Sequence, residues 1–416
     1  MIYLRLLGLL ALLTLLQSCL EDECSREMTY DKWIPISVDM DELRTNITTT
    51  APRALQNPGK IYAYQDYVFV NEQREGIHVI DNSNPADPRA VSFIEIPGNR
   101  DIAVRNGVLY ADQWVDLLAL DLAAPEAPQL LHRTPNFLPS MGTDVDGKLI
   151  VDYDVETVTE VFNCNEGTWL WANEFATADM AGGASPLAAA PGGNGTGGSM
   201  SRFTLVGSYL YTVSDRDISV FDVSNVAQPQ LLNQVNAGWR IETIFPSGNY
   251  LFLGSEVGMY IYDISDAANP VYVSEFQHAR ACDPVFVQGD LAYVTLRSGT
   301  ECDGFTNQLD VIDISNIQQP VLQRSFQMDN PHGLSIKDQT LYLCEGEHGL
   351  KSFDISDPLT LDQRQLQQLE QYHAFDVIVM PYAQDVLLLI GEDGFYQFDC
   401  STPGELELLS FMAVGA

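Results

Sequence analysis

The 416-residue chain is poor in basic residues. It has 21 lysines and arginines against 57 aspartates and glutamates, which gives a formal net charge of −36. A field of this sign repels a phosphate backbone, so the composition argues against nucleic acid as a partner. Cations or cationic partners fit the field better, and acidity that serves only solubility is the alternative interpretation.

Cysteine and the common catalytic motifs are also scarce. The seven cysteines show no C-x-x-C spacing, which disfavours zinc–thiolate and dithiol redox sites. The chain contains no G-x-S-x-G, P-loop, H-E-x-x-H or EF-hand sequence, which excludes those site classes but not enzymes that assemble a site from distant segments. Helical periodicity is nearly missing. Only residues 361–371, "LDQRQLQQLEQ", fit a helix, and their place in the repeat described below favours a strand or outer loop.

The N-terminus has the features of an exported chain. Residues 1–18, "MIYLRLLGLLALLTLLQS", place one arginine before a short leucine-rich run, which is typical of a secretory signal peptide. The segment "LQSC", which ends at Cys19, resembles the lipobox of bacterial lipoproteins, in which the cysteine is acylated with fatty acids such as palmitate. An incidental cysteine is the alternative. The acidic "LEDE" that follows resembles the signal that exports Bacteroidetes lipoproteins to the cell surface. We therefore expect a lipoprotein of the outer membrane, exposed on the cell surface, with residues 19–59 as a lipid-anchored spacer.

A repeated unit occupies the rest of the chain. Its anchor is an aspartate with apolar residues one and four positions before it and, in six of seven copies, a serine two positions after it. A proline stands seven positions after the aspartate in five copies. The seven aspartates are Asp81, Asp121, Asp222, Asp263, Asp313, Asp354 and Asp399. Because an aspartate carboxylate can accept the backbone N–H two residues on, and proline suits the start of an edge strand, the unit indicates two strands joined by a tight turn.

The period of the unit predicts a β-propeller. Successive aspartates are 40, 101, 41, 50, 41 and 45 residues apart, and a second strand pair precedes most of them. Each unit therefore holds four short strands, A to D in chain order, which is typical of a propeller blade. The long gap contains "GTDVDGKLIVDYDVETVTEVF" at residues 142–162, which we interpret as the A and B strands of a degraded unit. We predict an all-β propeller over residues 60–416 with eight blades, seven being the alternative.

The units resemble the LVIVD repeat, which is named after a strand such as "LDVIDIS" at residues 309–315. The resemblance extends from about residue 60 to the C-terminus. LVIVD repeats occur in exported and surface propeller proteins of bacteria. The resemblance implies a repeat used for display and binding, with no shared catalytic residue to transfer.

The direction of the strands sorts the loops onto two faces. If strand A runs from face X to face Y, the aspartate turns lie on face Y, whereas face X collects the starts of the A strands, the B–C loops and the D-to-A connections. The Gly/Ala/Pro-rich insertion at residues 176–201 is expected to be a mobile loop on face X. The loop at residues 297–307 lies on the same face, and a disulfide between Cys282 and Cys302 is expected to pin it. Cys344 and Cys400 fall in strands and are expected to be buried thiols.

Face X also collects the candidate ligand-binding residues. Trp114 and Trp239 map there, as do Trp169 and Trp171, and exposed aromatic rings suit a sugar ring or a partner protein. Packing between blades is the alternative for these tryptophans. A second set combines the carboxylates at the starts of A strands with the basic side chains beside them: Asp101, Glu242, Asp283, Asp376, Arg100, Arg240, His332 and His373.

Two kinds of chemistry suit this second set. A ring of carboxylates offers oxygen ligands for calcium, and no other cofactor is expected. Carboxylates with a histidine suit acid–base catalysis if burial separates their pKa values. Polar residues that merely bond to neighbouring blades are the competing interpretation. His332, His348 and His373 together match no known metal motif, so no metal ligand is assigned.

The sequence favours a non-enzymatic, surface-exposed lipoprotein whose propeller binds a glycan or a protein partner. A hydrolase or lyase with its site at the channel mouth is the first alternative, and a structural envelope component is the second. Two carboxylates and a histidine converging on one cavity would favour the enzyme. The same side chains scattered around a wide funnel would favour the binding protein.

Overall fold

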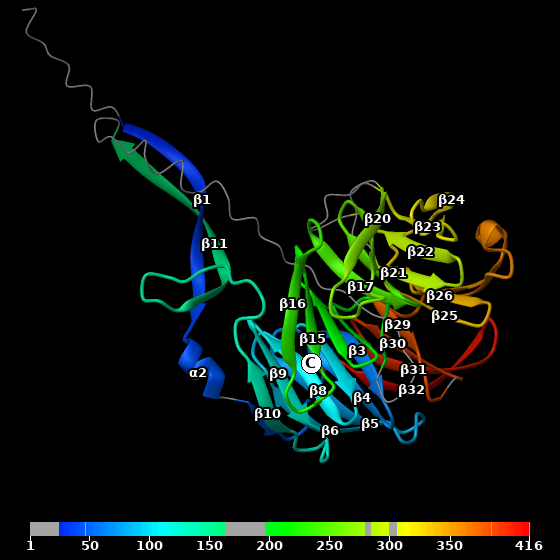
Figure 1. Ribbon diagram of the computed structural model, residues 1–416, viewed down its shortest axis with the longest axis horizontal. Coiled ribbons are helices and arrows are strands. Elements are labelled where there is room, and N and C mark those ends of the chain that lie inside the picture. The colour runs from blue at the N-terminus through cyan, green and yellow to red at the C-terminus, as the bar shows by residue number, and fades with distance from the viewer. Residues whose placement is uncertain are drawn as a thin grey trace, which may run out of the picture. The chain divides into compact units, whose positions relative to one another are not determined.

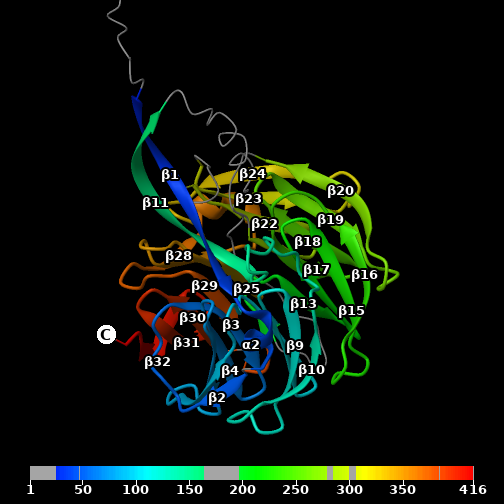
Figure 2. The same ribbon diagram turned by 90° about the vertical axis from the view of Figure 1, so that its left-hand side faces the viewer.

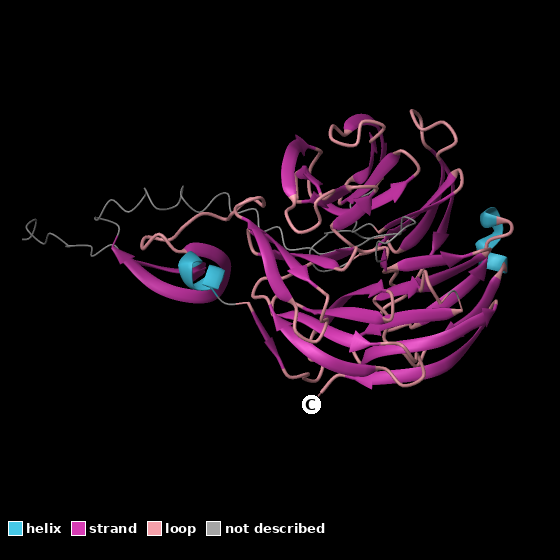
Figure 3. Ribbon diagram, turned by 60° about the horizontal axis from the view of Figure 1, so that its bottom comes forward, coloured by secondary structure: helices cyan, strands magenta, loops and turns pink. Residues whose placement is uncertain are grey.

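The structure is a computed structural model that describes residues 25–45, 47–163, 196–278, 284–298, 306–383 and 385–415. These residues belong to two compact units, one within residues 1–37 and 143–180 and the other within residues 38–142 and 181–416. Figure 3 shows how strongly strands dominate. The described helices are α2 (Met40–Thr45) and the 3₁₀ helix η2 (Pro358–Gln363). No helix in these ranges is long and apolar enough to cross a membrane.

The second unit is a propeller whose described strands form seven four-stranded antiparallel blades (Figure 1). Each blade comes from one continuous stretch of chain, with strands A to D in sequence order. Blade 1 contains β3 (Pro58–Tyr64), β4 (Tyr67–Glu72), β5 (Gly76–Asp81) and β6 (Arg89–Glu95). Blade 2 contains β7 (Ile102–Arg105), β8 (Val108–Gln113), β9 (Asp116–Asp121) and β10 (Gln129–Thr134). Blade 3 contains β13 (Phe203–Val206), β14 (Tyr209–Val213), β15 (Asp217–Asp222) and β16 (Gln230–Asn236).

The remaining four blades follow the same order. Blade 4 contains β17 (Ile241–Ser247), β18 (Tyr250–Ser255), β19 (Gly258–Asp263) and β20 (Val271–Gln277). Blade 5 contains β21 (Val285–Gln288), β22 (Leu291–Leu296), β23 (Gln308–Asp313) and β24 (Val321–Gln327). Blade 6 contains β25 (Leu334–Lys337), β26 (Thr340–Cys344), β27 (Leu350–Asp354) and β28 (Gln365–Leu369). Blade 7 contains β29 (Asp376–Val379), β30 (Val386–Gly391), β31 (Gly394–Thr402) and β32 (Glu405–Ala413).

The blades close into a ring. Each A strand contacts the A strand of the next blade, and β29 of blade 7 contacts β3 of blade 1 (Figure 2). The C-terminus supports this closure, because Val414 forms a parallel bridge with Leu55, just before β3. The stretch expected to be a spacer also contributes, since Thr48–Thr50 forms β2 on the outer edge of β6.

The repeated aspartate makes the predicted turn in every blade. In all seven copies its Oδ1 accepts the N–H two residues on, at 2.7–3.0 Å. The apolar residues one and four positions before it are at most 3% exposed in every copy. Blades pack face to face, so their inner strands are buried on both sides and consist of nearly continuous apolar residues. The repeat therefore encodes both the turn and the core.

The predicted eighth blade is wrong. The region assigned to it lies in the first unit, where β11 (Leu149–Asn163) pairs with β1 (Ser25–Val38) in a two-stranded sheet. Acidic residues and threonines separate its valines, and Val155 and Val161 are exposed. A strand between two blades needs nearly continuous apolar residues, which this polar-rich sequence does not supply. By contrast, residues 365–369 form the D strand β28, as their register predicted.

Candidate functional site

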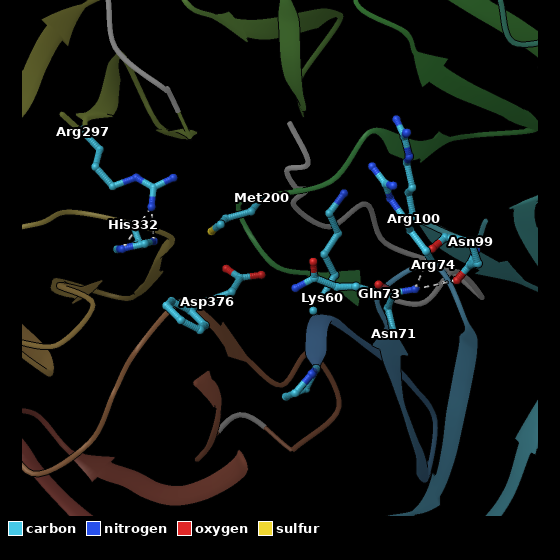
Figure 4. Close-up of a pocket in the computed structure, with 13 residues that line it drawn as sticks. Lys60, Asn71, Gln73, Arg74, Asn99, Arg100, Met200, Arg297, His332 and Asp376 are labelled. Atoms are coloured by element: carbon cyan, nitrogen blue, oxygen red, sulfur yellow. Dashed lines mark hydrogen bonds between the residues drawn. The ribbon is translucent and has the colours of Figure 1, made fainter. Parts of the chain in front are cut away.

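A cavity of about 360 Å³ opens at the mouth of the central channel on face X. Its walls come from the starts of A strands in blades 1, 6 and 7, from B–C connections in blades 1 and 5, and from the connection before blade 2. Figure 4 shows Arg297 and His332 on one side and Arg74 and Arg100 on the other, with Asp376 and Lys60 between them. The cavity thus lies on face X, the face to which strand direction assigned the candidate ligand-binding residues.

A short segment threads the channel below this cavity. Thr196–Gly197 forms β12, which pairs antiparallel with the inner edge of β3 and, together with β2 on the outer edge, makes blade 1 a six-stranded sheet. Further along, the Ser199 hydroxyl accepts the N–H of Leu334 at 2.6 Å. Met200 then lines the cavity. The end of the insertion expected to be a mobile loop is therefore bonded to two blades, while residues 176–195 lie outside the described residues.

Asp101 fixes the far end of this segment. Its carboxylate accepts hydrogen bonds from the Ser201 hydroxyl at 2.8 Å and from the backbone N–H of Arg202. The same carboxylate forms a buried ion pair with Lys60, whose Nζ lies 2.8 Å from Oδ2. Burial lowers the pKa of Lys60, against the opposing effect of Asp101. One carboxylate thereby joins blade 1, blade 2 and the segment that leads into blade 3.

Asp376 presents an incompletely bonded carboxyl group at the same cavity. The side chain is 2% exposed, and its Oδ1 accepts the N–H of Val377 at 2.9 Å. No hydrogen-bond partner for Oδ2 exists among the described residues. Burial raises the pKa of Asp376 to about 8, with Lys60 acting in the opposite direction. At neutral pH the group is therefore mainly a neutral acid, which can donate a hydrogen bond.

His332 contributes a buried imidazole to the wall of the cavity. Its ring lies beside Arg297, whose Nη1 is 3.2 Å from Nδ1 and 3.3 Å from Nε2. Burial, together with the charges of Arg297 and His373, lowers the pKa of His332 to about 2. The imidazole is therefore neutral throughout the physiological range and cannot itself attract an anion by charge.

Arg100 and Trp114 lie next to the connection between blades 1 and 2. Arg100 lines the cavity, and its backbone N–H donates to Asp112 at 2.9 Å. Trp114 packs against Gly98, where an added Cβ would overlap the indole ring, and Arg74 lies 5.8 Å from that ring. The Trp114 side chain is thus half-buried, with the guanidinium of the cavity residue Arg74 over its ring.

The other predicted residues do not join the cavity. Trp239 is 39% exposed and lies under Arg216, whose Cζ is 4.0 Å from the ring centroid. Arg240 is bound to Glu256 at 2.6 and 2.7 Å, and His373 lies 3.0 Å from Glu392. Glu242 is buried at the start of β17. Asp283, Cys282, Cys302, Cys19, Trp169 and Trp171 lie outside the described residues.

The sequence interpretation missed four parts of the site. These are Lys60, Arg74, Arg202 and the channel segment. A lysine at the start of the apolar strand "KIYAY" was an available signal, because a buried lysine requires a partner. Among the described residues, no group of three histidine, cysteine, aspartate or glutamate side chains could hold a metal ion. Cys344 and Cys400 are buried thiols, as predicted.

Comparison with known proteins supports the repeat and the fold. The LVIVD repeat family matches residues 59–93, 197–237, 242–277 and 279–328. No curated protein matches the chain.

Solved structures that resemble the chain share little of its sequence. The periplasmic gluconolactonase PpgL of Pseudomonas aeruginosa has a TM-score of 0.52 at 11% identity, covering 89% of this chain and 96% of its own. The computationally designed protein Ika8 has a TM-score of 0.50 at 11% identity, covering 89% and 92%. Hsv2 of Kluyveromyces lactis has a TM-score of 0.49 at 11% identity, covering 89% and 100%. At such identity the likeness concerns the fold alone.

Proposed function

We propose that this chain, which carries LVIVD repeats on a seven-bladed propeller, is a non-catalytic binding protein that holds the end of a glycan in the cavity on face X. The observation that carries this proposal is the cavity itself. Its volume of about 360 Å³ lies within the range of small-molecule sites, about 300–1,000 Å³, and its walls offer many polar groups to sugar hydroxyls.

The bonding around the cavity favours a rigid receptor. Asp101 fixes Lys60 and the channel segment, and Ser199 fixes the start of blade 6. A site whose walls are already ordered loses less conformational entropy when a ligand binds. Phe375 and Met200 add apolar surface on which the face of a sugar ring can pack.

We place this binding protein at the outer membrane, anchored through an acylated Cys19 and exposed on the cell surface. The support is the sequence around Cys19 together with the acidic residues that follow it. Metabolic labelling with a palmitate analogue tests the anchor. The wild-type chain is expected to be labelled and to fractionate with membranes, and Cys19→Ser is expected to lose both properties.

A glycan array tests the binding function. The full chain is expected to bind a restricted set of glycans, and Met200→Trp is expected to abolish that binding because the indole fills the cavity. Met141→Trp is the matched control, since Met141 is exposed at 42% and lies outside the cavity. Absence of glycan binding, with capture of an envelope protein that Met200→Trp also abolishes, would replace the glycan by a protein partner.

An enzyme is the second candidate, because Asp376 and His332 have oppositely shifted pKa values at one cavity. The geometry satisfies only part of the requirement for acid–base catalysis. The second carboxylate, Asp101, is held by Lys60 and by three further hydrogen bonds. Recovery of the bound glycan intact after prolonged incubation supports the binding protein. Its conversion by the wild type but not by Asp376→Asn would establish the enzyme.

A further inference from the structure

Three arginines are tied to one tripeptide at the edge of the cavity, Asn99–Asp101. The backbone N–H of Arg74 donates to the carbonyl of Asn99 at 3.0 Å. Arg100 is the central residue of the tripeptide, and the N–H of Arg202 donates to the carboxylate of Asp101. The side chains of the three arginines therefore begin close together at this tripeptide. They come from blade 1, from the connection into blade 2 and from the start of blade 3.

This region is rigid. Asp112 Oδ1 accepts the N–H of Arg100 at 2.9 Å and the N–H of Asp101 at 2.8 Å, and it also accepts the Asn99 amide at 2.9 Å. The Asn99 side chain in turn accepts from Asn71 at 2.7 Å. The buried Asp112 carboxylate thus accepts hydrogen bonds from backbone and amide groups.

The charges of Arg100 and Arg202 are incompletely balanced by the described residues. Arg202 bonds to Asp215 at 3.3 Å, and its Nε is buried without a partner in the described part of the chain. The guanidinium of Arg100 makes no hydrogen bond or ion pair with any described residue. Burial lowers the pKa of Arg100, and the neighbouring charges of Arg202 and Arg74 act in the same direction. Buried cationic side chains that lie close together raise the free energy of the folded state unless a negative group pairs with them, even in a protein of net charge −36.

We propose that Arg74 and Arg100, backed by Arg202, form an oxyanion subsite of the cavity, so that the bound glycan is acidic and presents a carboxylate or sulfate group to them. A guanidinium offers paired N–H donors that match the two oxygens of a carboxylate or sulfate, and the resulting bonds are charge-assisted. Arg74 and Arg100 both line the cavity on the same side, next to each other in Figure 4. This inference rests on the proposed glycan-binding function and names the class of glycan.

Titration of the full chain with monosaccharides tests the subsite, with Trp114 beside Arg74 as a fluorescent reporter and calorimetry as a second readout. The probes are glucose, glucuronate and glucose 6-sulfate. We expect glucuronate or glucose 6-sulfate to bind about tenfold or more tightly than glucose, because charge-assisted bonds add to those of the hydroxyls. The affinity should fall as salt is raised. A preference for one of the two acidic sugars identifies carboxylate or sulfate as the group.

Variants link the effect to the arginines. Arg100→Gln is expected to lower the affinity for the acidic sugar about tenfold or more, and Arg100→Lys to fall between it and the wild type, because lysine keeps the charge but not the paired donors. Arg74→Gln provides a second test should Arg100→Gln fail to fold. Arg89→Gln is the matched control, since Arg89 is exposed, pairs with Asp87 and lies away from the cavity.

The outcomes separate the two proposals. Equal affinity for glucose and both acidic sugars, or full affinity in a folded Arg100→Gln, overturns the subsite while leaving glycan binding in place. Arg100-dependent binding of the acidic monosaccharides, with no glycan recognised on the array, supports the subsite and overturns the glycan function. Absence of binding to all three probes overturns the subsite.

Discussion

Lys60 Nζ lies 2.8 Å from Asp101 Oδ2, and the two side chains are 9% and 2% exposed. This ion pair connects the A strand of blade 1 to the start of blade 2. Because Asp101 also accepts from Ser201 and Arg202, it holds the channel segment against both blades. The wall of the cavity therefore depends on a single buried carboxylate.

Asp101→Asn is expected to destabilise the protein strongly. The substitution keeps the shape but leaves the Lys60 ammonium buried without its counter-charge, which typically costs about 3–5 kcal/mol. Chemical denaturation monitored by circular dichroism measures the free energy of unfolding. Asp290→Asn is the control, since Asp290 is exposed in a turn, and it should change stability little. Lys60→Met combined with Asp101→Asn should recover part of the loss, and a double variant as unstable as the sum of both single variants would contradict the pairing.

Asp376→Asn is expected to alter the pH dependence of stability. Burial raises the pKa of Asp376 in the folded protein to about 8, so the folded state holds a proton that the unfolded chain releases near pH 4. Between these values the unfolded chain binds fewer protons, and this group makes stability fall as pH rises, by at most about 1.4 kcal/mol per pH unit. Asn cannot ionise, so the variant should gain stability relative to the wild type from about pH 5 to about pH 8. Parallel pH profiles of the two proteins would show that Asp376 is ionised in the fold.

Gly198→Ala tests the path of the channel segment. A Cβ at residue 198 would overlap the Asp376 carboxyl group, so overpacking should cost about 1–3 kcal/mol. Asp376→Ala removes the obstructing group, and the double variant should lose less stability than the two single variants added together. Additive losses in the cycle would mean that residue 198 does not lie against Asp376.

Asp222→Ala removes one copy of the repeated turn. Its carboxylate accepts the N–H of Ser224 at 2.7 Å, and this bond lowers the pKa of Asp222. A carboxylate whose pKa is lowered in the folded state stabilises the fold at pH values above its pKa in the unfolded chain, near 4. This stabilisation is lost as the pH falls through its pKa in the folded state. The variant should therefore be less stable at neutral pH by about 0.5–1 kcal/mol, at the lower end for such bonds because solvent screens the group. The deficit should vanish in acid, and a deficit of equal size at low pH would assign it to something other than the carboxylate.

The repeat made most of the fold predictable. An aspartate turn and flanking apolar residues are local signals, and strand direction then follows from their order, which placed Arg100, His332 and Asp376 at one channel mouth. The eighth blade was wrong because β11 has strand propensity without the two-sided apolar pattern of a blade strand. The channel segment was not predictable from composition, since its glycine-rich sequence bonds to β3, more than a hundred residues earlier. Arg202 was not predicted because its contact with Asp101 depends on the path of that segment. Lys60 was missed although its position in an apolar strand requires a buried partner, which Asp101 supplies.

Calorimetric titration of the full chain with two oligosaccharides that differ only in ending on glucuronate or on glucose tests the oxyanion subsite most directly. We expect the wild type to prefer the acidic oligosaccharide about tenfold or more, and this preference to shrink at high salt. The preference should disappear in Arg100→Gln and persist in Arg89→Gln. Equal affinity of the wild type for both oligosaccharides, or an unchanged preference in a folded Arg100→Gln, would contradict the oxyanion subsite.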